Sequence, residues 1–242
     1  MNMYSPEQMK ENIEKVRGQI ADAAKEAGRD PEEITLIGVS KFFPAEYAAQ
    51  AFSLGLTDLG ENRPEELHAK KETLNQEGIH PNWHLIGTIQ SRKVRMIAGD
   101  PYLIHSVDTL SLAKEISKRY QAKDITAKIL LEVNVSGEES KHGFSVEEVK
   151  SQFSDILELP CVDVCGLMTM APIQQKEGQA REVFEKTRVL FDDLKALGAD
   201  SSCWKYLSMG MSGDYKDAII CGATHVRIGT AIFGKRDYPD PV

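Results

Sequence analysis

Short apolar, β-branched segments alternate with amphipathic segments along the chain, and this alternation most restricts the possible folds. Eight segments have the composition of buried strands: 34–40, 57–60, 83–87, 102–107, 126–135, 162–168, 204–208 and 224–229. Longer stretches with helical spacing lie between them: 44–55, 63–78, 108–123, 145–159 and 178–198. Near-continuous apolar strands separated by helices imply a parallel sheet that helices cover.

Eight such units in 242 residues predict an α/β fold, a single closed (β/α)8 TIM barrel with residues 5–27 as an extra N-terminal helix. One core of this size is common for barrels. No low-complexity linker or internal repeat divides the chain, so we expect residues 1–242 to form one domain. An open, doubly wound sheet remains the structural alternative.

The charge and the hydropathy pattern exclude two classes of partner. With 29 basic and 37 acidic residues the net charge is −8, the wrong sign for a protein that coats nucleic acid. No apolar run approaches the roughly 18 residues that suggest a membrane span, and the N-terminus lacks the pattern of a secretory signal. We therefore expect a cytoplasmic protein without nucleic-acid or membrane partners.

The four cysteines, at positions 161, 165, 203 and 221, do not suggest a disulfide or a metal site. The closest pair lies four residues apart in a predicted strand, which separates the two by about 13 Å. That distance is too long for a disulfide or for a shared metal ion. We expect buried free thiols and no metal.

Lys41 places a charge at the end of an otherwise apolar segment, "LIGVSKFFP" (36–44). In a barrel this position lies at the C-terminal rim, where barrel enzymes collect their catalytic groups. Strand alternation puts Lys41 on the face of Ile37 and Val39, so its amine would rise from an apolar floor. Partial desolvation lowers the pKa of a lysine and makes a nucleophilic free amine more available. A lysine that extends from the strand end into solvent is the alternative.

The last two predicted strands are each followed by small and hydroxyl-bearing residues, in "YLSMGMSGDYKDAI" (206–219) and "HVRIGTAIFG" (225–234). Loops after strands seven and eight often form the phosphate site of a barrel. Their backbone N–H groups and hydroxyls could hold a dianion. The residues that could do so are Ser208, Gly210, Met211, Ser212, Gly229 and Thr230. Each glycine alone is weak evidence, because most such glycines are ordinary turn residues.

A carbonyl-reactive lysine that faces a phosphate site across the barrel mouth is the arrangement that pyridoxal 5′-phosphate (PLP) requires. Arg227 lies two residues before Gly229 on the same strand face and could reach the pyridine nitrogen. Because arginine keeps its protons, it would leave that nitrogen unprotonated and make the ring a poor electron sink. The sequence predicts PLP as the cofactor and only mild carbanion chemistry.

The chain resembles a known family over nearly its whole length. The motifs are "LIGVSKFFP", "LGENRPEEL", "WHLIGTIQSRK", "HSVD", "LLEVNVSGEESKHGF", "GLMTMAP", "LSMGMSGDYKDAI" and "VRIGTAIFG". Their order and number are those of the pyridoxal phosphate homeostasis proteins. The resemblance implies a barrel like the N-terminal domain of alanine racemase, PLP fold type III without the C-terminal β domain, with PLP held as a Schiff base on Lys41.

The resemblance also assigns roles to further positions. Asn62 of the "GEN" motif would lie beside the cofactor, and Arg227 would face the pyridine nitrogen. The phosphate contacts would be Ser208, Ser212, Gly229 and Thr230, with Met209 and Gly210 as the intervening loop. Lys141 matches a motif lysine near the mouth, although a solvated loop lysine fits the sequence as well.

Other positions are less informative for function. His84 and His105 end inner strands in the family pattern, but we interpret each as a satisfied core histidine. The chain departs from the pattern at Arg63 and Pro64, where an aromatic and an aliphatic residue are expected, and at Thr88, where histidine is frequent. These departures should alter the rim and leave the lysine and phosphate motifs intact.

Two functions of different classes fit these features. In the first, the protein binds PLP and buffers it or delivers it to PLP-dependent apoenzymes; no catalytic residue is then required, and a monomer suffices. In the second, it is a PLP-dependent amino-acid racemase in which Lys41 moves one proton. In alanine racemases the second base, on the other face of the substrate, is a tyrosine that belongs to a second domain. We expect no room for such a domain in this chain. We favour the carrier.

An aldolase is a third interpretation, but "VSKFFP" offers no further acid or base near Lys41.

Overall fold

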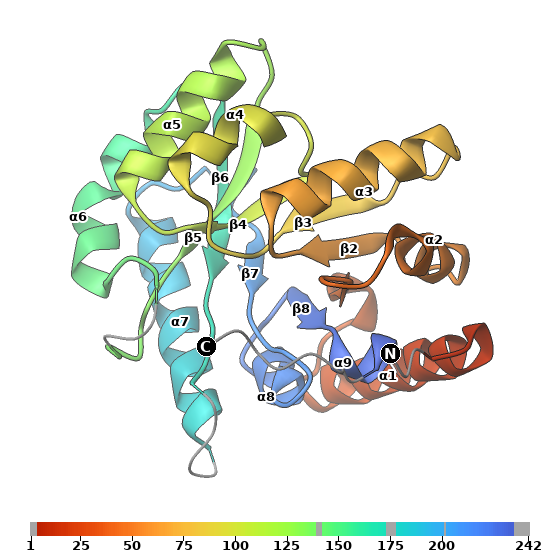
Figure 1. The fold of residues 1–242 in the computed structure, drawn as a ribbon. Coiled ribbons are helices and arrows are strands. Elements are labelled where there is room, and N and C mark those ends of the chain that lie inside the picture. Colours follow the sequence, from red (N-terminus) through yellow and green to blue (C-terminus); the bar gives the residue numbers. More distant parts are fainter. Residues whose placement is uncertain (1–3, 139–141, 173–177, 201, 235–242) are drawn as a thin grey trace.

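Eight parallel strands close into a barrel in sequence order, with β8 paired to β1 (Figure 1). The computed structural model describes residues 4–138, 142–172, 178–200 and 202–234. The strands are β1 (Thr35–Val39), β2 (Asp58–Glu61), β3 (Asn82–Leu85), β4 (Leu103–Val107), β5 (Ala127–Glu132), β6 (Val162–Met168), β7 (Tyr206–Ser208) and β8 (His225–Ile228). Every predicted strand is present, so the barrel prediction is confirmed and the open-sheet alternative is wrong.

Helices surround the barrel in the described ranges (Figure 1). They are α1 (Pro6–Glu26), α2 (Ala45–Ser53), α3 (Pro64–Gln76), α4 (Val94–Ile97), α5 (Leu110–Gln121), α6 (Val146–Leu157), α7 (Gln179–Ala196), α8 (Tyr215–Ile220) and α9 (Thr230–Phe233), with 3₁₀ turns at Pro31–Glu33 and Ser91–Lys93. The sequence did not predict α4, which has only four residues and follows directly after a 3₁₀ turn.

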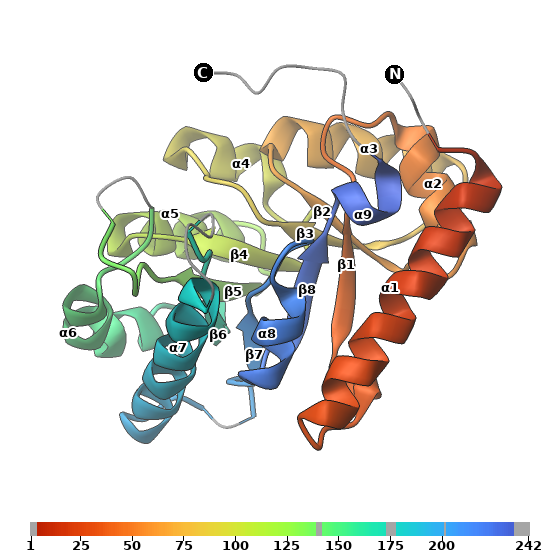
Figure 2. The same cartoon turned by 90° about the horizontal axis from the view of Figure 1, so that it is seen from below.

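Helix α1 is the expected addition to the eight repeating units. It begins with a capping box, in which the Ser5 side chain accepts from the backbone of Gln8 and the Gln8 side chain from that of Ser5. Its apolar stripe, which includes Met9, Ile13 and Val16, is buried. The helix packs against α8 and α9 along the outside of the barrel (Figure 2). It therefore supports the elements that carry the last two loops.

The barrel interior is unusually polar near its centre. His84 of β3, His105 of β4, Ser208 of β7 and Arg227 of β8 are almost completely buried. His105 contacts the side chain of Ser208, which belongs to a strand that is not its neighbour. Such a contact is possible only across the inside of the barrel. Between the strands and the outer helices the core is apolar, as where Trp204 stacks on a phenylalanine ring.

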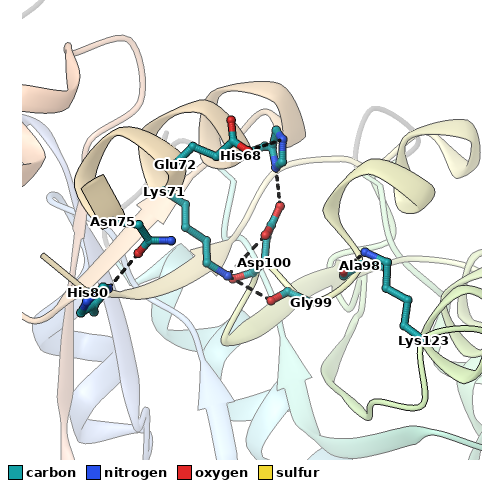
Figure 3. Close-up of polar contacts among 9 residues, drawn as sticks. All are labelled: His68, Lys71, Glu72, Asn75, His80, Ala98, Gly99, Asp100 and Lys123. Atoms are coloured by element: carbon teal, nitrogen blue, oxygen red, sulfur yellow. Dashed lines mark hydrogen bonds and ion pairs between the residues drawn. The ribbon is translucent and has the colours of Figure 1, made fainter. Parts of the chain in front are cut away.

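Two lysines outside the barrel tie α3 and the turn after α5 to the loop that follows α4 (Figure 3). Lys71 Nζ donates to the carbonyl oxygens of Gly99 at 3.0 Å and Asp100 at 2.9 Å. Lys123 Nζ donates to the carbonyl oxygen of Ala98 at 2.6 Å. Since carbonyls after a helix end lack partners within the helix, these cations satisfy them and fix the loop that leads into β4.

Two predictions about the whole chain can be compared with the structure. All four cysteines are free thiols, but only Cys165 is buried, so the expectation of four buried thiols is wrong for the other three. The half-buried cysteines lie outside the strands and helices: Cys161 before β6, Cys203 between α7 and β7, and Cys221 after α8. Within the described ranges, no helix combines the length and the apolar character that a membrane crossing requires.

Candidate functional site

A cavity of about 390 Å³ lies at the C-terminal ends of the strands. Its size is within the range of small-molecule sites, and this rim is where barrels place their ligands. Seven residues that the sequence singles out for ligand binding line it: Lys41, Asn62, Met211, Ser212, Arg227, Gly229 and Thr230. The structure therefore brings together residues from both ends of the chain on one cavity wall.

Lys41 occupies the turn directly after β1, and its side chain is half-buried on the cavity wall. Val39, two residues earlier, is buried and lines the same cavity, as strand alternation predicts. Phe42 follows with a φ of 68°, in the left-handed region that side chains rarely adopt. The chain thus turns sharply away after Lys41 and leaves this side chain at the mouth.

A buried polar cluster holds the strand end that precedes Lys41. Lys70 of α3 donates to the Glu61 carboxylate at 2.6 Å and to the carbonyl oxygen of Ser40 at 2.9 Å. The Ser40 hydroxyl donates to the same Glu61 oxygen at 2.6 Å. Glu61 also precedes Asn62 in the chain, so a single cluster fixes the backbone next to two cavity residues.

The loop after β7 is packed tightly against α8. Gly210 has a φ of 96°, and a Cβ atom there would lie 2.7 Å from the Ala218 side chain and 2.8 Å from the Tyr215 backbone. Glycine is therefore required at this turn. Met209 and Gly210 are buried behind the cavity and do not line it, which suits the role of an intervening loop. Met211 and Ser212 follow, and both are exposed and line the cavity.

Arg227 forms part of the cavity floor and is held on two sides. Its Nη1 donates to Ser208 Oγ at 2.6 Å, and its Nη2 donates to the carbonyl oxygen of Thr169 at 3.0 Å. Burial lowers the pKa of Arg227 to about 10, while Glu132 and Asp214 act in the opposite direction. The guanidinium is therefore charged at neutral pH.

Ser208 is placed differently from the other predicted phosphate contacts. Its side chain is completely buried beneath Arg227, and it is not among the described residues that line the cavity. His105 Nδ1 lies 2.9 Å from its hydroxyl oxygen. His84 Nδ1 in turn lies 2.8 Å from His105 Nε2. Both histidines are buried and hydrogen-bonded, which confirms their interpretation as satisfied core residues.

Glu132 is a cavity residue that the sequence reasoning missed. It is the last residue of β5, is 3% exposed, and lines the cavity together with Arg227. Burial raises its pKa to about 7, and the nearby charge of Asp108 acts in the same direction. The signal was available, because Glu132 ends an apolar strand with a charge in the same way as Lys41 does.

The donor groups around the cavity fit PLP. Lys41 offers an amine for an aldehyde, Arg227 offers a guanidinium for a ring acceptor, and the turns at Ser212 and Thr230 offer hydroxyls and backbone N–H groups for a phosphate. These donors come from β8 and from the turns after β1, β7 and β8, and they share one cavity of suitable size. Lys141, the other lysine of interest, lies outside the described residues.

Comparisons with known proteins agree with this geometry. The family described as "Alanine racemase, N-terminal domain" matches residues 6–237. The pyridoxal phosphate homeostasis protein of Aquifex aeolicus is 42% identical over 228 residues, which cover 94% of this chain and 98% of that relative. A solved structure of an unknown protein from Bifidobacterium adolescentis is similar with a TM-score of 0.88 and 35% identity, covering 94% of this chain and 95% of that one. The structure of PipY from Synechococcus elongatus with PLP bound has a TM-score of 0.78 and 31% identity, covering 89% of this chain and 100% of that one.

Proposed function

Since the chain belongs to the family of the pyridoxal phosphate homeostasis proteins, which share the barrel of the alanine racemase N-terminal domain, we propose that it binds PLP and serves intracellular vitamin B6 homeostasis. One observation carries the proposal. Lys41, Arg227 and the turns at Ser212 and Thr230 line the same cavity at the barrel mouth. The PLP-bound structure of PipY, which is similar over 89% of this chain, supports it further.

Each group has a definite task in this proposal. Bound PLP supplies an aldehyde that a neutral amine captures reversibly, with loss of water. Lys41 supplies that amine from the rim of the barrel. Arg227 donates a hydrogen bond to the ring nitrogen and, because it keeps its protons, leaves that nitrogen unprotonated. Ser212, Gly229 and Thr230 hold the phosphate, and Asn62 lies beside the ring.

The exposure of the site suits storage and transfer of the cofactor. Lys41 is half-buried, and Ser212 and Thr230 are exposed. Water and competing amines can therefore reach the link between lysine and cofactor, which favours exchange over protected chemistry. We propose that the protein buffers PLP or delivers it to PLP-dependent apoenzymes.

A second candidate, a PLP-dependent amino-acid racemase, is favoured by one observation. Racemisation requires an acid–base group on each face of the substrate's α-carbon. The described residues that line the cavity include no tyrosine, but they include Glu132, whose pKa is raised to about 7 by burial. Lys41 and Glu132 are therefore the pair that a racemase built on this cavity would use.

The proposal extends to the oligomeric state and the cellular compartment of the protein. The described lining of the cavity already includes an amine, a guanidinium and hydroxyl-bearing turns, so we propose that a monomer is sufficient to bind PLP. Free thiols at all four cysteines suit a reducing compartment, and we propose the cytoplasm.

Titration with PLP and an amino-acid assay test the two candidates together. If the protein is a carrier, the wild type should bind PLP and Lys41→Ala should bind it much more weakly. Lys114→Ala, an exposed change on α5, is the control and should bind PLP as the wild type does. A carrier should also produce no D-isomers when the loaded protein is incubated with a panel of L-amino acids. Turnover that both Lys41→Ala and Glu132→Gln abolish would establish the racemase instead. Equal PLP binding by wild type and Lys41→Ala would contradict both.

A further inference from the structure

A continuous chain of hydrogen bonds runs from the cavity through the barrel interior to its opposite end. Arg227 Nη1 donates to Ser208 Oγ at 2.6 Å, and Ser208 Oγ lies 2.9 Å from His105 Nδ1. His105 Nε2 lies 2.8 Å from His84 Nδ1, and His84 Nε2 lies 3.0 Å from Asp58 Oδ1. Asp58 is the first residue of β2, whereas Arg227 lies near the end of β8. The chain therefore connects the two ends of the barrel.

The two ends of this chain have fixed roles. Arginine carries only donors, and an ionised carboxylate carries only acceptors. Burial raises the pKa of Asp58, but hydrogen bonds from His84, Thr57 and Asn82 lower it more, and the net pKa is below the ordinary value. Asp58 is therefore ionised at neutral pH and accepts from His84 Nε2.

Fixed ends determine where the protons lie in between. His84 Nε2 donates to the Asp58 carboxylate, and where His84 Nδ1 accepts, His105 must donate from Nε2. Burial lowers the pKa of His105 well below 6.5, and the charge of Arg227 acts in the same direction, so His105 is neutral. Its Nδ1 then accepts from the Ser208 hydroxyl. That hydroxyl in turn accepts from Arg227.

The opposite proton arrangement fails at Ser208. With a proton on His105 Nδ1, the Ser208 oxygen would face two donors, His105 and Arg227. Its own hydroxyl proton would then lack an acceptor among the described residues that contact it. Leaving a buried donor unsatisfied costs the full desolvation penalty of that group. The structure therefore favours one direction of donation, from Arg227 to Asp58.

We propose that Asp58, His84, His105 and Ser208 are positioning residues for Arg227, and that together they form a one-way hydrogen-bond chain that fixes the guanidinium plane at the cavity floor. None of the four lines the cavity, so each acts through Arg227. The second bond, from Nη2 to the Thr169 carbonyl, completes the fixation. The effect on PLP rests on the proposed function, since it is there that Arg227 meets the ring nitrogen.

The proton positions can be measured without any cofactor. Nitrogen-15 NMR of histidine-labelled, PLP-free protein distinguishes protonated from bare ring nitrogens, and a His105→Gln variant identifies the His105 signals. We expect His105 to be neutral with a protonated Nε2 and a bare Nδ1, and His84 to show the same pattern. A proton on His105 Nδ1 would overturn the proposal, and this result does not depend on whether PLP binds.

The effect on the ligand is measured with matched serine variants. Ser208→Ala removes the hydroxyl that holds Arg227, Ser208→Thr keeps it, and Ser117→Ala removes a buried hydroxyl that donates to the Pro160 carbonyl on the far side of the barrel wall. We expect Ser208→Ala to weaken PLP binding about tenfold and to shift the absorbance maximum of the bound cofactor. Ser208→Thr should restore both quantities, and Ser117→Ala should leave both unchanged.

A variant at the far end of the chain tests whether the chain acts as a unit. Asp58→Asn does not touch Arg227, yet it replaces the obligate acceptor with a group that can also donate. We expect it to shift the bound-cofactor absorbance in the same direction as Ser208→Ala, and the double variant to shift it no further. Absorbance equal to wild type in both single variants, with normal PLP binding, would overturn the proposal.

Discussion

Lys70 donates a hydrogen bond to the Glu61 carboxylate at 2.6 Å inside the protein, where the Glu61 side chain is completely buried. The same Lys70 amine donates to the carbonyl oxygen of Ser40, the residue before Lys41. The ion pair thus joins α3 to the ends of β1 and β2, and both of these ends carry cavity residues. This buried charge pair therefore holds the backbone next to Lys41.

Breaking this pair should destabilise the fold strongly. Lys70→Met leaves the Glu61 carboxylate buried with only the Ser40 hydroxyl as a partner, and removing one member of a buried pair costs about 3–5 kcal/mol. Lys114→Met, an exposed change on α5, should stay within about 0.5 kcal/mol of wild type. Urea unfolding of the three proteins measures the difference. Equal midpoints would show that the pair does not stabilise the strand ends.

A pair of glycine variants tests the turn behind the cavity. Gly210→Ala places a Cβ atom 2.7 Å from the Ala218 side chain at a φ of 96°, so we expect a loss of about 1–3 kcal/mol in unfolding free energy. Gly213→Ala has no heavy atom within 4 Å of the added carbon, and its stability should be close to wild type. Similar losses in both variants would contradict the tight packing at Gly210.

Glu132 should make the stability of the PLP-free protein depend on pH. The folded-state pKa of Glu132 is raised to about 7 from 4.5, so between these values the folded protein holds a proton that the unfolded chain has lost. The Glu132 contribution to stability therefore falls as pH rises through this window. Glu132→Gln has no carboxyl at this position that titrates, so it does not lose this stability as pH rises. The stability of the variant relative to wild type should therefore be greater at pH 8 than at pH 5, by at most about 3 kcal/mol.

The control for this prediction is Glu147→Gln, an exposed change on α6. Its stability relative to wild type should be nearly the same at both pH values. Denaturant unfolding at pH 5 and pH 8 gives the four comparisons. A Glu132→Gln effect that is equal at the two pH values would show that the carboxyl titrates normally in the folded protein.

The phosphate turns can be tested by comparing two ligands. PLP and pyridoxal differ only in the phosphate, so a residue that binds the phosphate affects PLP and leaves pyridoxal unchanged. Ser212→Ala and Thr230→Ala should each weaken PLP binding about tenfold, the size expected for a lost hydrogen bond to a charged group. Equal weakening of both ligands would place these hydroxyls elsewhere than at the phosphate.

The sequence predicted the barrel because its evidence is local. Each strand is a short apolar segment bounded by turn residues, and the segment that ends at Lys41 is recognisable without knowledge of its neighbours. Lys41, Ser212 and Thr230 were found because motifs at strand ends must meet at one rim in any parallel barrel. Their common cavity follows from topology alone.

What the sequence did not predict depends on contacts between distant strands. Ser208 belongs to a sequence that is typical of a phosphate-binding turn. In the structure, however, its hydroxyl lies beneath Arg227 and beside His105. No local pattern distinguishes a hydroxyl that points to the mouth from one that points into the barrel. Glu132 was missed although its position at a strand end resembles that of Lys41, because an acidic residue does not fit the search for a carbonyl-reactive amine.

The most direct test of the central claim is borohydride reduction of the wild-type protein loaded with PLP, followed by digestion and mass spectrometry of the peptides. Reduction makes the link between amine and aldehyde permanent, so the modified residue identifies the group that holds the cofactor. We predict that the peptide containing Lys41 carries the reduced cofactor and that Lys41→Ala loses this modification. Stoichiometric modification of a different lysine, with Lys41 unmodified, would contradict this prediction.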